Sequence, residues 1–154
     1  MDTQAIFGLQ FLLSLIAWGV VVGLLPSRWL AQKPRHEALL WLSLPHVFRH
    51  IGMVFLVPGV VDQTLPAGFS IPAAYGDLAT GLLALGAILA LHSKWSLAIP
   101  LVWTFNVVGT VDLANALRHL DVAPLFGAAW YIPTMLVPLL LVTHFLMFKR
   151  LLGR

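Results

Sequence analysis

Residues 38–61 read ALLWLSLPHVFRHIGMVFLVPGVV, a long and mostly apolar segment. Its only ionisable residues, His46, Arg49 and His50, lie close together near its centre. About 20 predominantly apolar residues in a helix cross the ~30 Å hydrocarbon layer of a bilayer. The stretch is therefore predicted to be a transmembrane helix that carries ionisable side chains near the middle of the membrane.

Four further apolar stretches of similar length flank this one. Only 10% of the residues are charged and 60% are hydrophobic, whereas a soluble domain carries about 25% charged residues. Because Asp2 is the only charge before the first stretch, we expect a retained helix there and not a signal peptide. The prediction is an all-α integral membrane bundle, a single domain over residues 1–154 with five transmembrane helices at about 5–25, 38–61, 73–91, 95–117 and 130–148.

Basic residues are distributed unevenly between the two sides that five spans would define. One side collects Arg28, Lys33, Arg35, Lys94, Lys149, Arg150 and Arg154, whereas the other has Arg118 with Asp2, Asp62 and Asp121. Basic loops stay in the cytoplasm, so we predict an external N-terminus and a cytoplasmic C-terminus. Basic residues confined to loops and tails do not form a nucleic-acid-binding face. The absence of cysteine excludes disulfides and thiolate catalysis.

The ionisable residues of the second span have a helical spacing. His46, Arg49 and His50 are related by i, i+3 and i+4, so an α-helix would place them on one face. Pro45 cannot donate a backbone hydrogen bond and is expected to kink the helix beside that face. A charge at the bilayer centre costs about 2.5–3.5 kcal/mol. Arg49 is therefore expected to find partners inside the bundle.

Aspartates in two neighbouring spans are the predicted partners. The third and fourth spans run antiparallel, which puts Asp77 and Asp112 at similar depth, and we predict that Arg49 pairs with one or both. One arginine between two carboxylates leaves a negative charge that a proton could neutralise. The sequence therefore predicts a site that binds or translocates a small polar or anionic solute, or relays protons, formed by His46, Arg49, His50, Asp77, Asn106, Asp112 and Asn115.

Three other interpretations stay open. His46 and His144, with His50 as a substitute, could be axial ligands of haem b in an electron-transfer protein, although a hydrogen bond from His144 to a backbone carbonyl is the simpler expectation. The second is a metal-dependent membrane enzyme with His46, His50, Asp77 and Asp112 as ligands, which is disfavoured because the predicted depths of His46 and Asp77 differ by more than a metal site can bridge. The third is a structural or accessory subunit.

No cofactor, metal site or catalytic residue is predicted. The sequence contains no HExxH, P-loop, GxGxxG or GxSxG motif, so enzymatic activity is not favoured. Gly19 and Gly23 form a GxxxG motif in the first span, which permits close approach of another helix. That helix could belong to a second copy of the chain in a homo-oligomer or to the same bundle.

Four stretches, LPHVFRHIGMVFLVPGVV (44–61), YGDLATGLLAL (75–85), FNVVGTVDLANA (105–116) and WYIPTMLVPLLLVTH (130–144), resemble an uncharacterised family of small bacterial multi-pass membrane proteins. The resemblance covers about two-thirds of the chain. It implies a location in the bacterial inner membrane and implies no chemistry, so no residue role follows from it.

Overall fold

The computed structural model describes residues 2–24 and 26–153. Leu25, where the first span was predicted to end, and Arg154 lie outside the described residues. The regular elements of the described residues are all helical. In chain order they are α1 (Thr3–Leu24), α2 (Pro26–Gln32), α3 (Arg35–Ser43), the 3-10 helix η1 (Leu44–Leu56), α4 (Ala67–His92), α5 (Ala98–Leu117), the 3-10 turns η2 (Leu120–Leu125) and η3 (Gly127–Trp130), the π-helical turn η4 (Ile132–Leu136), and α6 (Val137–Leu152).

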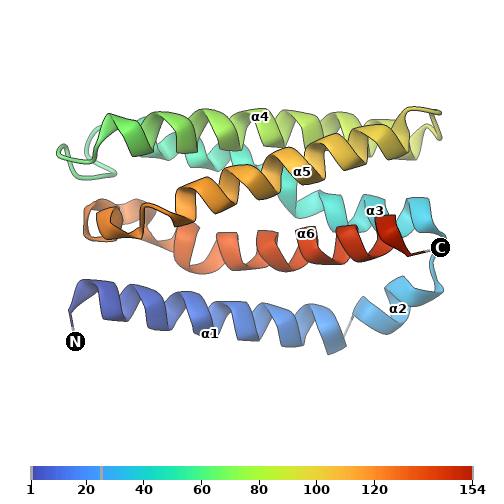
Figure 1. Ribbon diagram of the computed structural model, residues 1–154, viewed down its shortest axis with the longest axis horizontal. Helices are drawn as coiled ribbons and strands as arrows, with labels where there is room; N and C mark the ends of the chain where they lie inside the picture. The colour runs from blue at the N-terminus through green and yellow to red at the C-terminus, as the bar shows by residue number, and fades with distance from the viewer. Residues whose placement is uncertain (1, 25, 154) are drawn as a thin grey trace.

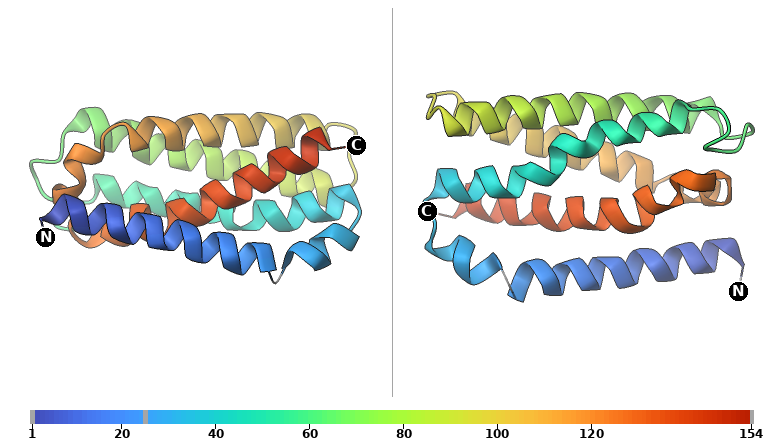
Figure 2. Two further views of the ribbon diagram at one scale, coloured as in Figure 1. Left: turned by 60° about the horizontal axis from the view of Figure 1, so that its bottom comes forward. Right: turned by 180° about the vertical axis from the view of Figure 1, so that it is seen from behind.

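The long helices form one elongated bundle in which the chain runs back and forth (Figure 1). We call the end that holds the N-terminus the N-end, and the opposite end, which holds the C-terminus, the C-end. η1 packs along α4, α4 packs against α5, and α1 lies beside α6 at the edge (Figure 2). The connections 57–66 and 118–131 therefore lie at the N-end, and α2 and the turn 93–97 lie at the C-end.

Four helical segments of the described residues are long and apolar enough to cross a membrane: Thr3–Leu24, Arg35–Leu56, Ala67–His92 and Gly127–Leu152. They overlap the first, second, third and fifth predicted spans, with ends that differ by one to six residues. The fourth predicted span corresponds to α5, a helix of 20 residues that packs beside α4 and α6. Its Asn106, Asp112 and Asn115 lower the hydropathy of that segment.

The second predicted span is not a continuous α-helix. α3 ends at Ser43 and the chain continues as 3-10 helix for 13 residues, although such runs rarely exceed about four residues. With three residues per turn, side chains three apart lie in line. The buried residues of η1 follow that period: His46, Arg49, Gly52 and Phe55. The prediction that His50 shares the face of Arg49 is wrong because it assumed an α-helical period, and His50 is exposed.

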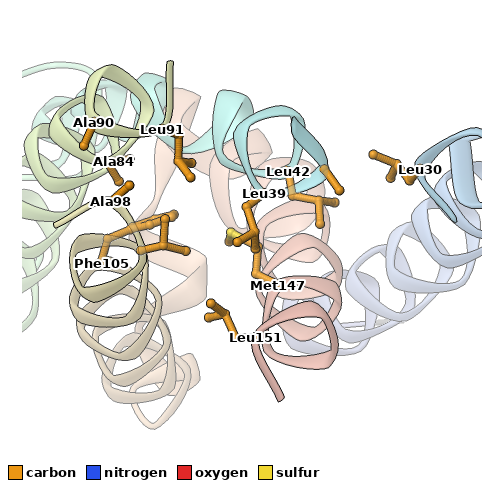
Figure 3. Packing of buried hydrophobic residues seen from close by; sticks show 13 residues of the cluster. Leu30, Leu39, Leu42, Ala84, Ala90, Leu91, Ala98, Phe105, Met147 and Leu151 are labelled. Atoms are coloured by element: carbon orange, nitrogen blue, oxygen red, sulfur yellow. The ribbon is translucent and has the colours of Figure 1, made fainter. Parts of the chain in front are cut away.

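Two apolar clusters fill the bundle, one towards each end. At the C-end, Leu39 of α3 and Met147 of α6 face each other, with Phe105 of α5 nearby, as Figure 3 shows. At the N-end, Phe55 and Phe126 belong to an aromatic cluster. The buried charged residues Arg49, Asp77 and Asp112 lie between these two apolar clusters.

α1 contributes little to this core. Only Phe7 and Val22 among its described residues are buried, while most of its large apolar side chains are exposed. A β-carbon added at Gly19 would meet no neighbouring atom within 4 Å, so this part of the GxxxG motif makes no close contact inside the bundle. The outer surface of α1 is suited to lipid.

Candidate functional site

Arg49 is the centre of the polar interior. Its Nε donates to Asp77 Oδ1 at 2.7 Å, and its Nη2 donates to Asp112 Oδ2 at 2.5 Å. Its Nη1 donates to the Gly109 carbonyl at 3.2 Å. The guanidinium thus joins η1 to α4 and α5, and its side chain is 0% exposed. The prediction that Arg49 pairs with one or both aspartates is confirmed, and both are its partners.

The charges in this cluster do not balance. One guanidinium faces two carboxylates, whose side chains are 13% and 16% exposed for Asp77 and Asp112 respectively. A buried ion pair is stable only when hydrogen bonds offset the loss of water, and Arg49 meets this condition with three different acceptors. The formal sum is nevertheless one negative charge.

His144 of α6 extends the cluster towards Asn106 of α5. Its Nδ1 lies 2.6 Å from Asn106 Oδ1, and its Nε2 lies 3.5 Å from Arg49 Nη1. An amide oxygen only accepts hydrogen bonds. His144 therefore carries its proton on Nδ1 and turns the lone pair of Nε2 towards the guanidinium. The expected bond from His144 to a backbone carbonyl is not the one that forms, because a side-chain acceptor is within reach.

His46 lies directly against His144, with ring centroids 4.2 Å apart. Its Nε2 lies 2.9 Å from Thr143 Oγ1. That hydroxyl is 3.0 Å from the carbonyls of Leu139 and Leu140, to which it donates. Nε2 of His46 is therefore the donor to Thr143, and Nδ1 has the lone pair.

The contact between these two imidazoles does not fit the haem alternative. Axial ligands of one haem iron stand on opposite faces of the macrocycle. Rings whose centroids are 4.2 Å apart leave no room for a porphyrin between them, and His46 Nε2 is already bonded to Thr143. A metal site is not supported either, since no three His, Asp or Glu side chains of the described residues converge closely enough to hold an ion.

A cavity of about 240 Å³ lies beside Arg49 and Asp77, between η1 and the η4–α6 segment. Its remaining lining is almost entirely apolar, and the exposed Phe48 and Ile51 form part of it. It therefore opens through the apolar flank of the bundle. A pocket of only about 30 Å³ touches Asp77 and Asp112 on the side of the N-end aromatic cluster. Neither of these two spaces is lined mainly by polar side chains.

A sequence model described as "Domain of unknown function (DUF8737)" matches residues 6–152. The chain belongs to this family. No curated protein and no solved structure matches the chain.

In this DUF8737 chain, five of the seven predicted site residues converge: His46, Arg49, Asp77, Asn106 and Asp112. The other two do not. His50 is exposed and its Nδ1 lies 2.9 Å from the Val47 carbonyl of its own helix. Asn115 is exposed at the N-end, in a shallow depression with Asp112 and His119.

Three glycines form part of this site, and they were not among the residues predicted from the sequence. A β-carbon at Gly52 of η1 would overlap Asp77 Oδ2, and one at Gly76 of α4 would overlap Asp112 Oδ1. At Gly109 of α5 it would lie 2.7 Å from His144 Nε2. Each helix therefore presents a glycine where a polar side chain of its neighbour must fit. Their positions in the sequence were the one indication of this role. Gly52 lies three residues after Arg49, Gly109 lies three residues before Asp112, and Gly76 directly precedes Asp77.

Three buried polar atoms around His144 have no partner among the described residues: His46 Nδ1, Thr80 Oγ1 and Asn106 Nδ2. His46 and Asn106 contact His144 directly. A β-carbon at Gly109 would lie 2.7 Å from both Thr80 Cγ2 and His144 Nε2, so Thr80 borders the same space. Buried polar groups normally have a protein or water partner. These atoms can bind water on the C-end side of the ion cluster.

Proposed function

We propose that this protein spans the bacterial inner membrane with five helices and binds and relays a proton at its buried polar cluster. The spans are α1, α3–η1, α4, α5 and α6, with the N-terminus outside and the C-terminus in the cytoplasm. Charge supports this orientation, because basic residues of the described chain concentrate at the C-end: Lys33 and Lys94 in the connections, Arg35 at the start of α3, and Lys149 and Arg150 in the last turn of α6.

The observation that carries the proposal is the pairing of one guanidinium with two carboxylates away from water. Arg49 compensates Asp77 and Asp112 only in part, because it has one positive charge for two negative ones. A lone charge inside hydrocarbon is costly. A proton neutralises the excess charge without needing the volume of a hydrated ion, so the cluster is suited to hold one.

The polar groups beyond Arg49 supply a continuation towards the C-end. His144 Nε2 faces the guanidinium with its lone pair, and its Nδ1–H is bonded to Asn106. His46 Nδ1 and Thr80 Oγ1 are free to bind water near this histidine. We propose that bound water carries a proton from the carboxylates to the lone pair of His144 Nε2 and then from that nitrogen to His46 Nδ1, while Asn106 holds the Nδ1–H side of the His144 imidazole.

A proton fits this site better than a small polar or anionic solute. The donors of Arg49 are directed at Asp77, Asp112 and Gly109, so an anion would have to displace a carboxylate. The neighbouring cavity offers almost only apolar walls.

Self-association through Gly19 and Gly23 is a separate proposal, supported only by their spacing on the exposed helix α1.

Infrared spectroscopy of the purified protein at different pH values tests the binding of a proton. Protonation of a carboxylate creates a carbonyl band, and we expect one buried group to gain it as the pH is lowered. Asp112→Asn should remove this band, whereas Asp121→Asn, at an exposed position of the N-end, should preserve it. An unchanged spectrum in Asp112→Asn would contradict the proposal.

Proton relay is tested in liposomes with an entrapped pH dye. Under an imposed pH gradient, the wild-type protein should dissipate the gradient faster than empty liposomes, and His144→Phe should slow it. Wild-type liposomes as tight as empty ones would reject the relay. If no band appeared in the infrared experiment either, the cluster would serve only to fix the helices, as in an accessory subunit.

A further inference from the structure

A second cavity lies far from the ion cluster, at the C-end. It has a volume of about 420 Å³ and separates the α2–α3 segment from the end of α6. Its walls are formed by Leu30, Ala31, Arg35, Leu42, Leu146, Lys149, Arg150 and Gly153, which we call the basic groove. Leu146, Lys149 and Arg150 of α6 have the spacing i, i+3 and i+4, which places them on one face of the α-helix, and Gly153 directly follows the end of that helix. On α3, Arg35 and Leu42 are seven residues apart and also share a face.

The charge of the basic groove is entirely positive. Arg35, Lys149 and Arg150 line it, and no acidic residue does. The nearby Glu37 is engaged elsewhere, in an ion pair with Lys33 at 2.7 Å. The groove therefore has no counter-charge of its own among the described residues.

Two of these cations are held in place by backbone carbonyls across the groove. Arg35 Nη2 donates to the Leu151 carbonyl at 2.7 Å, and Arg150 Nη2 donates to the Leu30 carbonyl. Each of these bonds uses one N–H of a guanidinium that has five. Lys149 makes no side-chain hydrogen bond or ion pair within the described part of the chain and is exposed. Donors therefore remain for an anion.

The floor of the basic groove has the opposite character. Leu30 and Leu42 are buried apolar residues, and Leu146 packs against the same C-end core. A free inorganic anion gains nothing from such a floor. A molecule with an anionic head and a hydrocarbon chain gains from both the cations and the leucines.

Two exposed tryptophans indicate where the C-end lies relative to the bilayer. Trp29 and Trp41 pack edge to face with ring centroids 5.3 Å apart, and both are exposed. Lys33 Nζ lies 4.8 Å from the Trp29 ring centroid. Exposed tryptophans with neighbouring basic residues are typical of the headgroup region of a bilayer. The basic groove is next to this pair in the chain, since Leu30 and Leu42 directly follow the two tryptophans.

We propose that the basic groove binds an anionic phospholipid. The phosphate lies among Arg35, Lys149 and Arg150, and the start of one acyl chain runs along Leu30, Leu42 and Leu146. The proposal rests on the proposed membrane location of the bundle, but it holds whether or not the Arg49 cluster binds a proton. Such a lipid would tie α6 to the α2–α3 segment, because the groove has cations from both.

Thermal unfolding of the full chain in detergent tests this site. Dioleoyl phosphatidylglycerol should raise the Tm of the wild-type protein, whereas dioleoyl phosphatidylcholine and inorganic phosphate should not. Lys149→Gln removes a cation that holds no other side chain, and it should weaken the apparent affinity for phosphatidylglycerol about fivefold. Lys94→Gln is the matched control, because Lys94 has the same charge at the same end but lies outside the groove.

Native mass spectrometry gives a second readout that does not depend on stability. Wild-type protein should retain one phosphatidylglycerol molecule, and Lys149→Gln should retain less than Lys94→Gln. Equal losses in the two variants would show a diffuse charge effect and overturn the groove as the site. An equal Tm shift with inorganic phosphate would show an anion site that does not use the leucines, which also overturns the lipid.

Discussion

Gly76 of α4 lies directly against the carboxylate of Asp112 of α5. A β-carbon at position 76 would overlap Asp112 Oδ1, so the ion pair between Asp112 and Arg49 exists only because residue 76 has no side chain. Gly52 gives the same space to Asp77. The helix spacing and the charge cluster therefore depend on each other.

Gly76→Ala is expected to destabilise the protein strongly. The added methyl must push Asp112 away, which combines overpacking, about 1–3 kcal/mol, with weakening of a buried ion pair. Gly86→Ala is the matched control on the same helix, because a β-carbon there meets no atom within 4 Å. Thermal unfolding in detergent should show a large drop in Tm for the first variant and little change for the second. Equal effects would mean that helix backbone properties, and not this contact, decide the result.

Arg49→Ala should be among the most damaging substitutions in the chain. It leaves two carboxylates without a cation, and breaking a buried pair in this way costs about 3–5 kcal/mol. Arg49→Ala combined with Asp112→Ala leaves a single carboxylate, so the double variant should unfold at a higher temperature than the Arg49→Ala single variant. A double variant less stable than either single variant would contradict the charge cluster. The comparison is made by thermal unfolding in one detergent and one buffer.

The sequence was sufficient to predict the helical bundle and the ion pairs, for a physical reason. A charge in an apolar run must find a partner, and only Asp77 and Asp112 were available at a similar depth to Arg49. The prediction for His50 was wrong because the position of its side chain depends on the helical period. His50 was assigned to the site by an α-helical spacing, whereas η1 has three residues per turn and turns His50 outward.

The glycines and the unpartnered atoms could not be predicted in the same way. The site requires glycine at positions 52, 76 and 109 because a polar side chain of a neighbouring helix lies against each of them. The way in which two helices cross cannot be predicted from the sequence of one segment. The same holds for Thr80, which borders the space beside His144 although the two residues lie on different helices. Packing between segments determines these positions.

Asp62 gives a prediction outside the spans, in the connection between η1 and α4. Its carboxylate accepts hydrogen bonds from Thr64 Oγ1 at 2.6 Å and Thr64 N at 2.8 Å, which hold the pKa of Asp62 below its ordinary value. A carboxyl with a lowered pKa in the folded state contributes stability above its unfolded pKa, and this is lost as the pH falls through the folded pKa.

Thr64→Val removes the hydroxyl and should raise the pKa of Asp62 towards that of an ordinary aspartate. The carboxyl carbon shift of Asp62, followed by NMR during an acid titration, measures the change. Thr64→Ser keeps a hydroxyl at this position and is the matched control, so it should leave the titration of Asp62 close to that of the wild-type protein. An unchanged Asp62 titration would show that the backbone bond alone is sufficient.

The 3-10 period of η1 makes a prediction that separates it from an α-helix. Relative to His46, an α-helix would turn His50 by about 40° and Phe55 by about 180°. A 3-10 helix turns them by about 120° and 0° instead.

Because the chain has no cysteine, single cysteines at positions 50 and 55 can carry spin labels without a background. In liposomes, the label at 50 should be accessible to dissolved oxygen and the label at 55 should be protected. Since Phe48 is exposed and His46 is buried, labels at positions 48 and 46 give the reference values for high and low oxygen accessibility. The reverse order at 50 and 55 would restore the α-helix and return His50 to the face of Arg49.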